Sequence, residues 1–311
     1  YRKEATGGLD DAQLRHIEER NTYLRELAER KDTVLASIEE QGKLTDELKQ
    51  AILAADTKAR VEDLYLPYKK RRKTKADIAR EAGLEELEQL LIDDPTLDPI
   101  TAAANFTSEG FPDAAAALEG ARAILVDRFA LDADLVSEVR DRVFEQGTLR
   151  ASVVSGNESE GAKFADYFDF SEPFTKLPSH RILALLRGET EGVLTLDFDP
   201  GEEAIYEGMI VRAFDLPDSE WVNKAVRWGW RTKLQVAANL DTRMRLREVA
   251  EAGALEVFKT NLRDVLLAAP AGQRATLALD PGYRNGVKCA VVDGTGKVLA
   301  TSIVYPHQPQ N

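Results

Sequence analysis

The stretch LALDPGYRNGVKCAVVDGTGK at 277–297 joins two short apolar runs through turn-forming residues. The first of these runs begins at about residue 274, and a third apolar run at 297–304 follows the turn sequence DGTG. Three such runs separated by turns predict a three-stranded antiparallel meander. Because a meander of about forty residues buries too little surface to be stable alone, we expect it to open a larger α/β domain. We also expect the chain to be a fragment of a longer protein.

Helical periodicity precedes the meander. From about residue 9 to residue 267 the apolar residues mostly recur every three or four positions, as in helices that bury one face. Asp10 can cap a first helix, Gly42 can end a helix before Thr45 starts the next, and Gly83 separates two more. The segment EGVLTLDFD at 191–199 is the only strand that we predict before residue 270. The fold class is therefore predicted to be mainly α.

Changes of composition divide the chain into three expected parts. The first is a helical domain at 1–169, which ends before the sequence FSEP. The second is a central helical region at 170–272 with one short strand, and within it we predict separate helices at 221–234 and 241–267. The third, at 273–311, is the incomplete domain that the meander begins.

The overall charge restricts the partners of the chain. Its 311 residues include 41 basic and 54 acidic side chains, a formal net charge of -13. Nucleic acid and anionic membranes repel such a chain on average, so contact with either requires a local basic patch. The single cysteine, Cys289, excludes an internal disulfide and a multi-cysteine zinc site. No apolar run reaches about 18 residues and no signal segment is seen, so we expect a cytoplasmic protein without membrane contact.

The segment at 58–75 is such a basic patch. It holds eight basic and two acidic residues, a local net charge of plus six (8 − 2), with Tyr65 and Tyr68 beside them. A phosphate backbone or an acidic partner surface would select this composition, although a solvated loop also explains it. The candidate contacts for nucleic acid or a partner are Lys69, Lys70, Arg71, Arg72, Lys73 and Lys75.

All three tryptophans lie in the segment WVNKAVRWGWRTK at 221–233. Trp221 and Trp228 are seven positions apart and therefore share a helix face, while Trp230 points elsewhere. Four basic residues are interleaved with them, a composition that can stack on single-stranded nucleic acid and neutralise its phosphates. An aromatic helix face packed into the core explains the same spacing, and this is the interpretation that we adopt.

The histidines do not indicate a metal site, because His16, His180 and His307 share no ligand spacing. His180 and Arg181 stand at a predicted helix start, where backbone N–H groups can hold a phosphate. Capping of that helix by Ser179 explains the same sequence. His180 and Arg181 are therefore secondary contact candidates. We expect no cofactor, because the glycine pair at 7–8 has neither of the phosphate-loop spacings.

Asp280, at the end of the first predicted strand, is the candidate for catalysis or metal binding. Two-metal phosphoryl chemistry needs several carboxylates that converge on cations about 4 Å apart. Asp293, the other acid of the meander, falls at the far end of the hairpin, roughly 20 Å away at about 3.3 Å per residue. We therefore expect no complete active site in this chain, and any such site needs acids from elsewhere.

Five stretches of the chain resemble the Tex family of bacterial transcription accessory proteins. They are YRKEATGGLDDAQLR at 1–15, DLYLPYKKRRKTKA at 63–76, FSEPFTKLPSHRILALLRGE at 170–189, LDPGYRNGVKCAVVDGTGK at 279–297 and YPHQPQ at 305–310. The resemblance implies a helical N-terminal region with a helix-turn-helix-like part, followed by a YqgF-type domain of the RNase H and resolvase fold. It aligns Asp280 with the first-strand acid of that fold, where related nucleases place a metal ligand.

Our leading hypothesis, which the resemblance implies, is a helical scaffold through which a transcription accessory protein holds RNA or DNA. RNA polymerase or ribosome-associated machinery is the protein partner that this role suggests. One alternative is that the complete protein is a Mg²⁺-dependent resolvase-like nuclease with Asp280 as its first metal ligand. The other is a purely structural scaffold whose basic segment docks an acidic protein.

Overall fold

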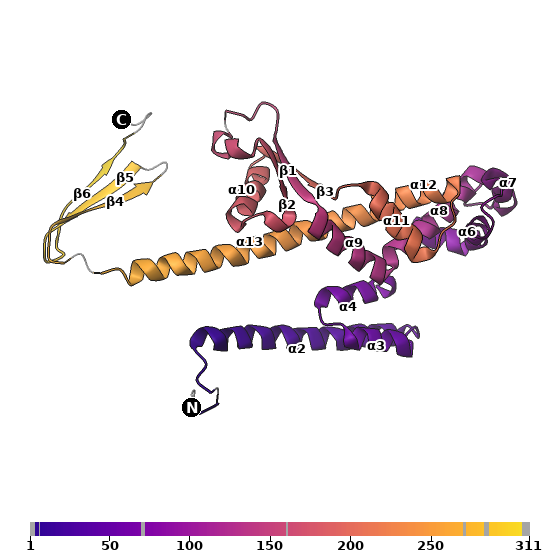
Figure 1. Cartoon of the computed structure of the whole chain (residues 1–311), viewed down its shortest axis with the longest axis horizontal. Helices are drawn as coiled ribbons and strands as arrows, with labels where there is room; N and C mark the ends of the chain where they lie inside the picture. The colour runs from indigo at the N-terminus through magenta and orange to yellow at the C-terminus, as the bar shows by residue number, and fades with distance from the viewer. Residues whose placement is uncertain are drawn as a thin grey trace. The chain divides into compact units, whose positions relative to one another are not determined.

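The computed structural model describes residues 4–5, 7–69, 72–159, 161–269, 272–282 and 286–306. Contacts divide the chain into two units, Tyr1–Ala252 and Gly253–Asn311. Helices predominate in the first unit, and strands β4 to β6 form the sheet of the second (Figure 1). The predicted mainly α fold with an added β-meander is confirmed. Within the described ranges, no helix is long and apolar enough to cross a membrane.

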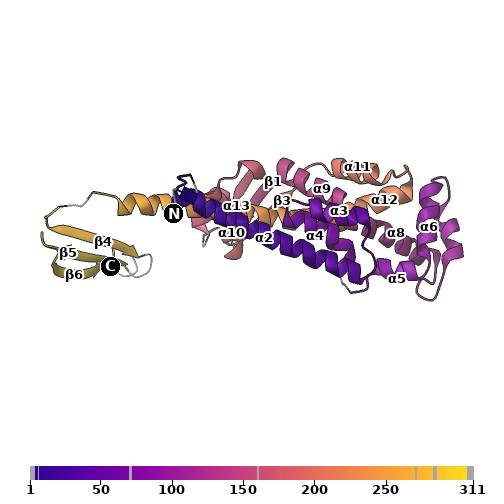
Figure 2. The same cartoon turned by 90° about the horizontal axis from the view of Figure 1, so that it is seen from below.

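Three N-terminal helices share a small core of their own. They are α2 (Asp11–Glu40), α3 (Asp46–Ala54) and α4 (Lys58–Tyr65), and α2 packs against both of the others (Figure 2). The side chains buried between them are Leu27, Val34, Ile38, Ile52, Ala55 and Val61. Asp10 caps α2 by accepting the Gln13 N–H at 2.8 Å, and Thr45 caps α3. The predicted helix starts are therefore confirmed.

The larger core of the first unit surrounds α8 (Ala114–Leu131). Its sequence AAAALEGARAILVDRFAL is small or apolar on most sides, which is typical of a buried helix. The helices packed against it are α5 (Lys75–Glu81), α6 (Leu84–Asp93), α7 (Pro99–Ala103), α9 (Ala133–Gln146) and α12 (Glu220–Gly229). Gly120 permits this close packing, because a Cβ at that position would clash with Leu84 and Phe111.

A three-stranded antiparallel sheet completes the first unit, in the order β2-β1-β3. The strands are β1 (Thr148–Val153), β2 (Asp169–Pro173) and β3 (Leu194–Asp199), and the helices α10 (Ser179–Thr190) and α11 (Glu203–Phe214) flank β3 in the chain. The predicted strand is confirmed as β3, but the prediction of a single strand before residue 270 is wrong. The edge strand β2 reads DFSEP, and Asp, Ser and Pro give no apolar alternation from which a strand can be recognised.

Helix α12 continues through a π-helical turn (Trp230–Leu234) into α13 (Gln235–Leu266). The predicted break between helices at 221–234 and 241–267 is therefore wrong. The intervening QVAANL contains neither glycine nor proline, so nothing in it opposes continuation of the helix. Ala238, Leu246 and Ala250 on the first half of α13 are buried in the larger core.

In the second unit, β4 (Thr276–Gly282), β5 (Gly286–Val292) and β6 (Val298–Val304) form an antiparallel sheet in that order. The register pairs Asp280 with Lys288, and Thr276 with Val292. A short turn that includes Gly296, whose φ is 86°, connects β5 to β6. This arrangement confirms the predicted meander.

Glu88 on α6 is a buried carboxylate in the larger core. Its Oε1 accepts a hydrogen bond from Arg128 Nη1 at 2.8 Å, while Oε2 has no hydrogen-bond partner among the described residues. Burial raises the pKa of Glu88 above its ordinary value, because the loss of hydration outweighs the attraction of Arg128. A raised carboxyl pKa favours the folded state most below the unfolded pKa, and this contribution is lost as the pH rises through the folded pKa.

We therefore expect Glu88→Gln to be about 1 kcal/mol more stable than the wild type at neutral pH. The glutamine keeps an acceptor for Arg128 and removes the charge that burial disfavours. The advantage should shrink as the pH falls toward the unfolded Glu value of about 4.3. Urea denaturation at several pH values measures it, with Glu86→Gln on the exposed face of α6 as the control. A stability difference that does not change with pH would contradict the prediction.

Candidate nucleic-acid interface

Of the predicted basic contacts, Lys69, Arg72 and Lys73 lie between the 3-10 turn at Leu66–Tyr68 and α5, and Lys75 is the first residue of α5. Thr74 and Asp77 form a capping box there: the Asp77 N–H donates to Thr74 Oγ1 at 3.2 Å, and the Thr74 N–H donates to Asp77 Oδ2 at 2.9 Å. This box fixes the start of α5 and places Lys75 at its first helical position. Two of the six candidates, Lys70 and Arg71, lie outside the described residues.

Lys69 and Lys73 are paired with acids of their own unit. Lys69 Nζ lies 2.5 Å from Glu62 Oε2, and Glu62 Oε1 accepts a hydrogen bond from Arg30 Nε at 2.6 Å. The Arg30 hydrogen bond is the main cause that holds the pKa of Glu62 below its ordinary value. Lys73 Nζ lies 2.6 Å from Glu81 Oε2. The charges of these two lysines are therefore partly neutralised within the protein.

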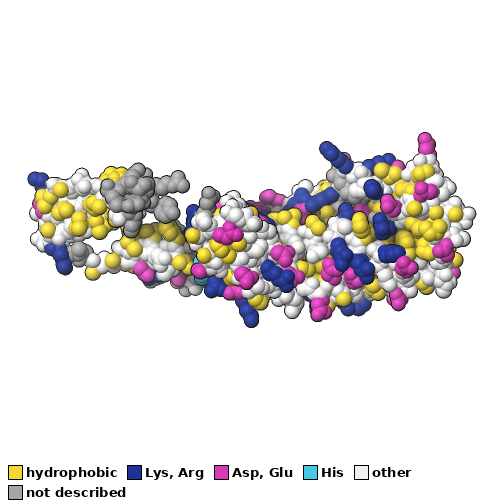
Figure 3. All heavy atoms as spheres, turned by 90° about the horizontal axis from the view of Figure 1, so that it is seen from above, with side chains coloured by type: hydrophobic (Ala, Val, Ile, Leu, Met, Phe, Trp, Pro, Cys, Tyr) yellow, Lys and Arg dark blue, Asp and Glu magenta, His cyan; other side chains and the backbone are white. Residues whose placement is uncertain are grey.

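Arg72 and Lys75 have no such partners among the described residues. Both side chains are exposed, and neither makes an ion pair within the part of the chain that the structure describes. The visible face of the helical unit mixes Lys and Arg with Asp and Glu side chains (Figure 3). Because basic and acidic side chains are mixed on this surface, a basic residue by itself is weak evidence of a ligand contact. A basic residue without an acidic partner is stronger evidence.

The first part of the basic segment has internal contacts instead. Lys58 Nζ lies 2.6 Å from Glu26 Oε2 on α2. Arg60 donates to the Ala133 carbonyl oxygen at 3.0 Å and pairs with Asp134 at the start of α9. These two cations connect helices of the first unit, so the basic patch available to a ligand is narrower than the sequence indicates.

The three tryptophans have different environments. Trp221 is 8% exposed, and Trp230 is fully buried with its ring stacked on Tyr206 at a centroid distance of 4.2 Å. Trp228 is 51% exposed, and the Arg122 guanidinium carbon lies 4.8 Å from its ring centroid. The core-packing interpretation is therefore confirmed for Trp221 and wrong for Trp228, while the tryptophan expected to point elsewhere is the most deeply buried.

The packing of α12 on α8 explains this difference. The two helices approach closely at Gly229, where a Cβ would lie 2.8 Å from the Phe129 ring. The π-helical turn begins at the next residue and changes the rotation from one side chain to the next. As a result Trp230 is buried in the core, whereas Trp228 is 51% exposed.

Three of the four basic residues in the tryptophan segment are ion-paired. Lys224 pairs with Glu220 at 2.6 Å, Arg227 with Glu207 at 3.5 Å and Arg231 with Glu203 at 2.6 Å. Lys233 is exposed and makes no ion pair with any described residue. It resembles Lys75 in this respect.

Lys75 and Lys233 both line one small cavity of about 270 Å³, which we call the cationic hollow. Its lining residues are Thr74, Lys75, Ala76, Glu119, Arg122, Ala123, Val126, Asp127, Trp228 and Lys233. Tertiary packing therefore brings Lys75 of the basic segment together with Trp228 and Lys233 of the tryptophan segment. Arg122 could not be predicted from the sequence, because an arginine within an apolar helix carries no local signal of binding.

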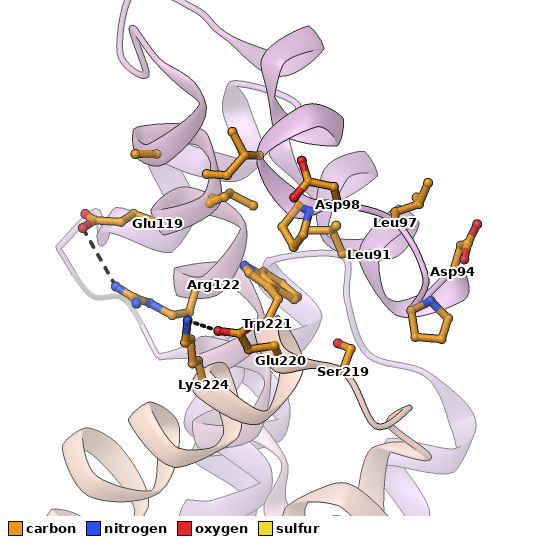
Figure 4. A pocket seen from close by; sticks show the side chains of 15 residues that line it. Leu91, Asp94, Leu97, Asp98, Glu119, Arg122, Ser219, Glu220, Trp221 and Lys224 are labelled. Carbon is orange, nitrogen blue, oxygen red and sulfur yellow. Dashed lines mark hydrogen bonds and ion pairs between the residues drawn. The ribbon is translucent and has the colours of Figure 1, made fainter.

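A larger cavity of about 530 Å³ shares Glu119 and Arg122 with the cationic hollow. Figure 4 shows the Arg122 side chain directed toward Glu119, and Trp221 in the lining. Its charged lining residues are Asp94, Asp98, Glu119, Arg122, Glu220 and Lys224. Because acids outnumber bases in this lining, the larger cavity suits a phosphate less well than the cationic hollow does.

The secondary candidates His180 and Arg181 do not line the cationic hollow. Helix α10 begins at Ser179 and has Pro178 as its N-cap, without a side-chain capping bond. The predicted Ser179 cap is therefore wrong, since this residue already occupies the first helical position. His180 is exposed, and Arg181 pairs with Glu172 on β2. Phosphate contact by these two residues stays a prediction.

Asp280 is an exposed carboxylate near the end of β4, beside a lysine. Its side chain is 77% exposed, and Lys288 Nζ lies 3.9 Å away. Asp293 follows Val292, which pairs with Thr276 at the opposite end of the hairpin, as predicted. In the described ranges, no group of three or more His, Cys, Asp or Glu side chains could hold a metal ion. Metal binding by Asp280 stays a prediction that depends on residues outside this chain.

Comparisons with known proteins give consistent similarities along the chain. Three family models match it: a Tex-like protein N-terminal domain at 1–39, a Tex central region-like model at 94–258 and a Tex protein YqgF-like domain at 274–311. The chain is 54% identical to the transcriptional accessory protein Tex of Neisseria gonorrhoeae and 51% identical to protein YhgF of Escherichia coli strain K12. Each of these alignments covers all of this chain and 42% of the relative.

A human protein, S1 RNA-binding domain-containing protein 1, is 28% identical over 99% of this chain and 32% of its own length. The chain therefore spans less than half the length of these curated relatives.

Proposed function

The chain belongs to the Tex family, and from this premise we propose that it contributes a nucleic-acid contact to a transcription accessory protein. Two relatives support the class of function by their names, one as a transcriptional accessory protein and one as an S1 RNA-binding domain-containing protein. The observation that carries the proposal is the pair of exposed cations Arg72 and Lys75, which have no acidic partner among the described residues.

In this proposal Arg72 and Lys75 neutralise phosphates of the backbone. Lysine and arginine contacts release condensed counterions, and this release supplies most of the affinity that does not depend on base sequence. Lys69 and Lys73 would have to leave Glu62 and Glu81 to do the same. We therefore assign them smaller contributions, and we retain Lys70 and Arg71 as contacts predicted from the sequence.

Replacing Arg72 and Lys75 together with alanine should weaken binding of a single-stranded oligonucleotide to this chain about tenfold at low salt. The slope of log K against log salt should also become shallower by about 1.4, since each phosphate contact on a single strand contributes about 0.7. Fluorescence anisotropy of a labelled oligonucleotide between 50 and 200 mM salt, about the range in which such contacts are lost, measures both quantities.

The matched control is Lys58→Ala with Lys224→Ala. It removes the same charge, but both lysines are paired in the folded chain, with Glu26 and Glu220. We expect it to change the affinity and the salt slope much less. An unchanged affinity and slope in the Arg72 and Lys75 variant, or an equal effect of the control, would contradict the proposal. The docking of an acidic protein would then be the better explanation of the basic segment.

A further inference from the structure

Trp228 is 51% exposed and lines a cavity whose lining is rich in cations. Large aromatic side chains contribute most to stability when they are buried, as Trp230 is two residues later. Arg122 lies 4.8 Å from the Trp228 ring centroid, a distance at which a guanidinium stacks on an aromatic ring. Trp228 therefore contacts Arg122 but still has surface that a ligand can reach.

The charges around this ring favour an anionic ligand. Lys75 and Lys233 line the cavity without an ion pair to any described residue, and the ion pair of Arg122 with Glu119 is long, at 4.0 Å. The second acid of the lining, Asp127, accepts a hydrogen bond from Arg80 at 3.0 Å. The lining therefore holds three cations and two carboxylates. Of the carboxylates, Glu119 is largely exposed and Asp127 already has Arg80 as a partner.

The backbone of Trp228 is held by the turn that follows it. Thr232 Oγ1 donates to the Trp228 carbonyl oxygen at 2.7 Å within the π-helical turn. Trp230 anchors the same turn in the core through its stacking on Tyr206. π-helical turns often occur at functional sites. Here the turn connects the exposed ring of Trp228 to Lys233.

We propose that Trp228 stacks on one unpaired base of single-stranded RNA or DNA, while Lys75, Arg122 and Lys233 contact the adjacent phosphates. This inference rests on the proposed function and adds a base-stacking site to it. An aromatic ring beside cations recognises single strands, because every base has a π-face and the cations follow the backbone. The cavity of about 270 Å³ lies below the roughly 300–1,000 Å³ of small-molecule pockets, so it suits one flat ring rather than a whole cofactor.

The test compares Trp228→Ala with the wild-type chain on three ligands of equal length: a dT oligonucleotide, an rU oligonucleotide and an abasic DNA. We expect affinity for the two base-bearing oligonucleotides to fall at least fivefold, with an unchanged salt slope, and affinity for the abasic strand to stay the same. Trp228→Phe should keep most of the affinity, because it retains an aromatic face. Phe258→Ala, which removes another exposed ring, serves as the control.

Tryptophan fluorescence gives a second readout. Trp221 and Trp230 are buried, so quenching by a bound oligonucleotide should arise mainly from Trp228 and disappear in Trp228→Ala. If the dT and rU oligonucleotides respond alike, the site does not distinguish DNA from RNA, as stacking alone predicts. Circular dichroism of the variant verifies that the fold is retained.

The outcomes separate the stacking site from the proposed function. If the Arg72 and Lys75 variant weakens binding while Trp228→Ala does not, the stacking site is overturned and the phosphate contact stands. If neither variant weakens binding, both proposals fall. If Trp228→Ala weakens binding of the abasic strand as much as that of the base-bearing strands, the hollow recognises an anionic chain such as an acidic protein segment, and stacking is overturned.

Discussion

Replacing Trp230 with alanine should lower the free energy of unfolding by about 4 kcal/mol, as expected when a fully buried tryptophan is truncated. The ring is 0% exposed and stacks on Tyr206 with an interplanar angle of 1°. The loss combines the transfer free energy of the ring with the cavity that it leaves at the junction of α12 and α13. Urea denaturation followed by circular dichroism measures the change.

Trp230→Phe is the informative comparison. The indole Nε1 has no hydrogen-bond partner among the described residues, so phenylalanine loses part of the ring but no hydrogen bond. We expect a loss of about 1–2 kcal/mol, well below that of alanine. Trp228→Ala should cost less than either, because half of that ring is already exposed. Equal effects at positions 228 and 230 would contradict the assignment of Trp230 as the core residue.

Replacing Asp63 with alanine should destabilise the chain by about 3 kcal/mol, because it leaves a largely buried arginine without its main partner. Asp63 on α4 is 7% exposed and accepts two hydrogen bonds from Arg140 on α9, at 3.1 and 2.6 Å. Asp241 lies 3.7 Å from Arg140 and can compensate only in part. Urea denaturation measures the loss of stability.

The ion pair links the small core of the N-terminal helices to the larger core. Hydrogen exchange should therefore show greater loss of protection in α2 to α4 than in α8 when Asp63 is replaced. Replacing both partners, as in Asp63→Leu with Arg140→Met, should recover most of the stability, because both charges of the pair are removed and Asp241, which loses its contact with Arg140, is 38% exposed. A loss below about 1 kcal/mol for Asp63→Ala would indicate that the pair is effectively hydrated, as surface ion pairs are.

Much of the fold follows from local sequence signals. The starts at Asp10 and Thr45, the separation at Gly83 and the meander after residue 272 correspond to the observed elements. These signals are reliable because a cap or a turn involves residues only two to four positions apart. Strands β1 and β2 were missed because their residues have weak strand preference and gain stability from pairing with distant segments.

The candidate site could be predicted only in part from the sequence. The two segments that it indicated, one basic and one rich in tryptophan, both contribute to the cationic hollow. Composition could not distinguish Lys75 from Lys73, because the ion pair of Lys73 with Glu81 depends on how α5 folds. Helical periodicity could not distinguish Trp228 from Trp221, since both positions lie on the same face of an ideal helix.

The sequence by itself determined the family, the order of the helices, the meander and the two segments from which binding residues should come. The tertiary structure alone decided which cations have no acidic partner among the described residues, which tryptophan is exposed, and that Arg122, Trp228 and Lys233 lie around the same hollow as Lys75. The physical reason is the distance along the chain between the residues that interact. Caps, turns and periodicity depend on neighbours in the chain, whereas ion pairing, burial and the lining of a cavity depend on helices that meet only after folding.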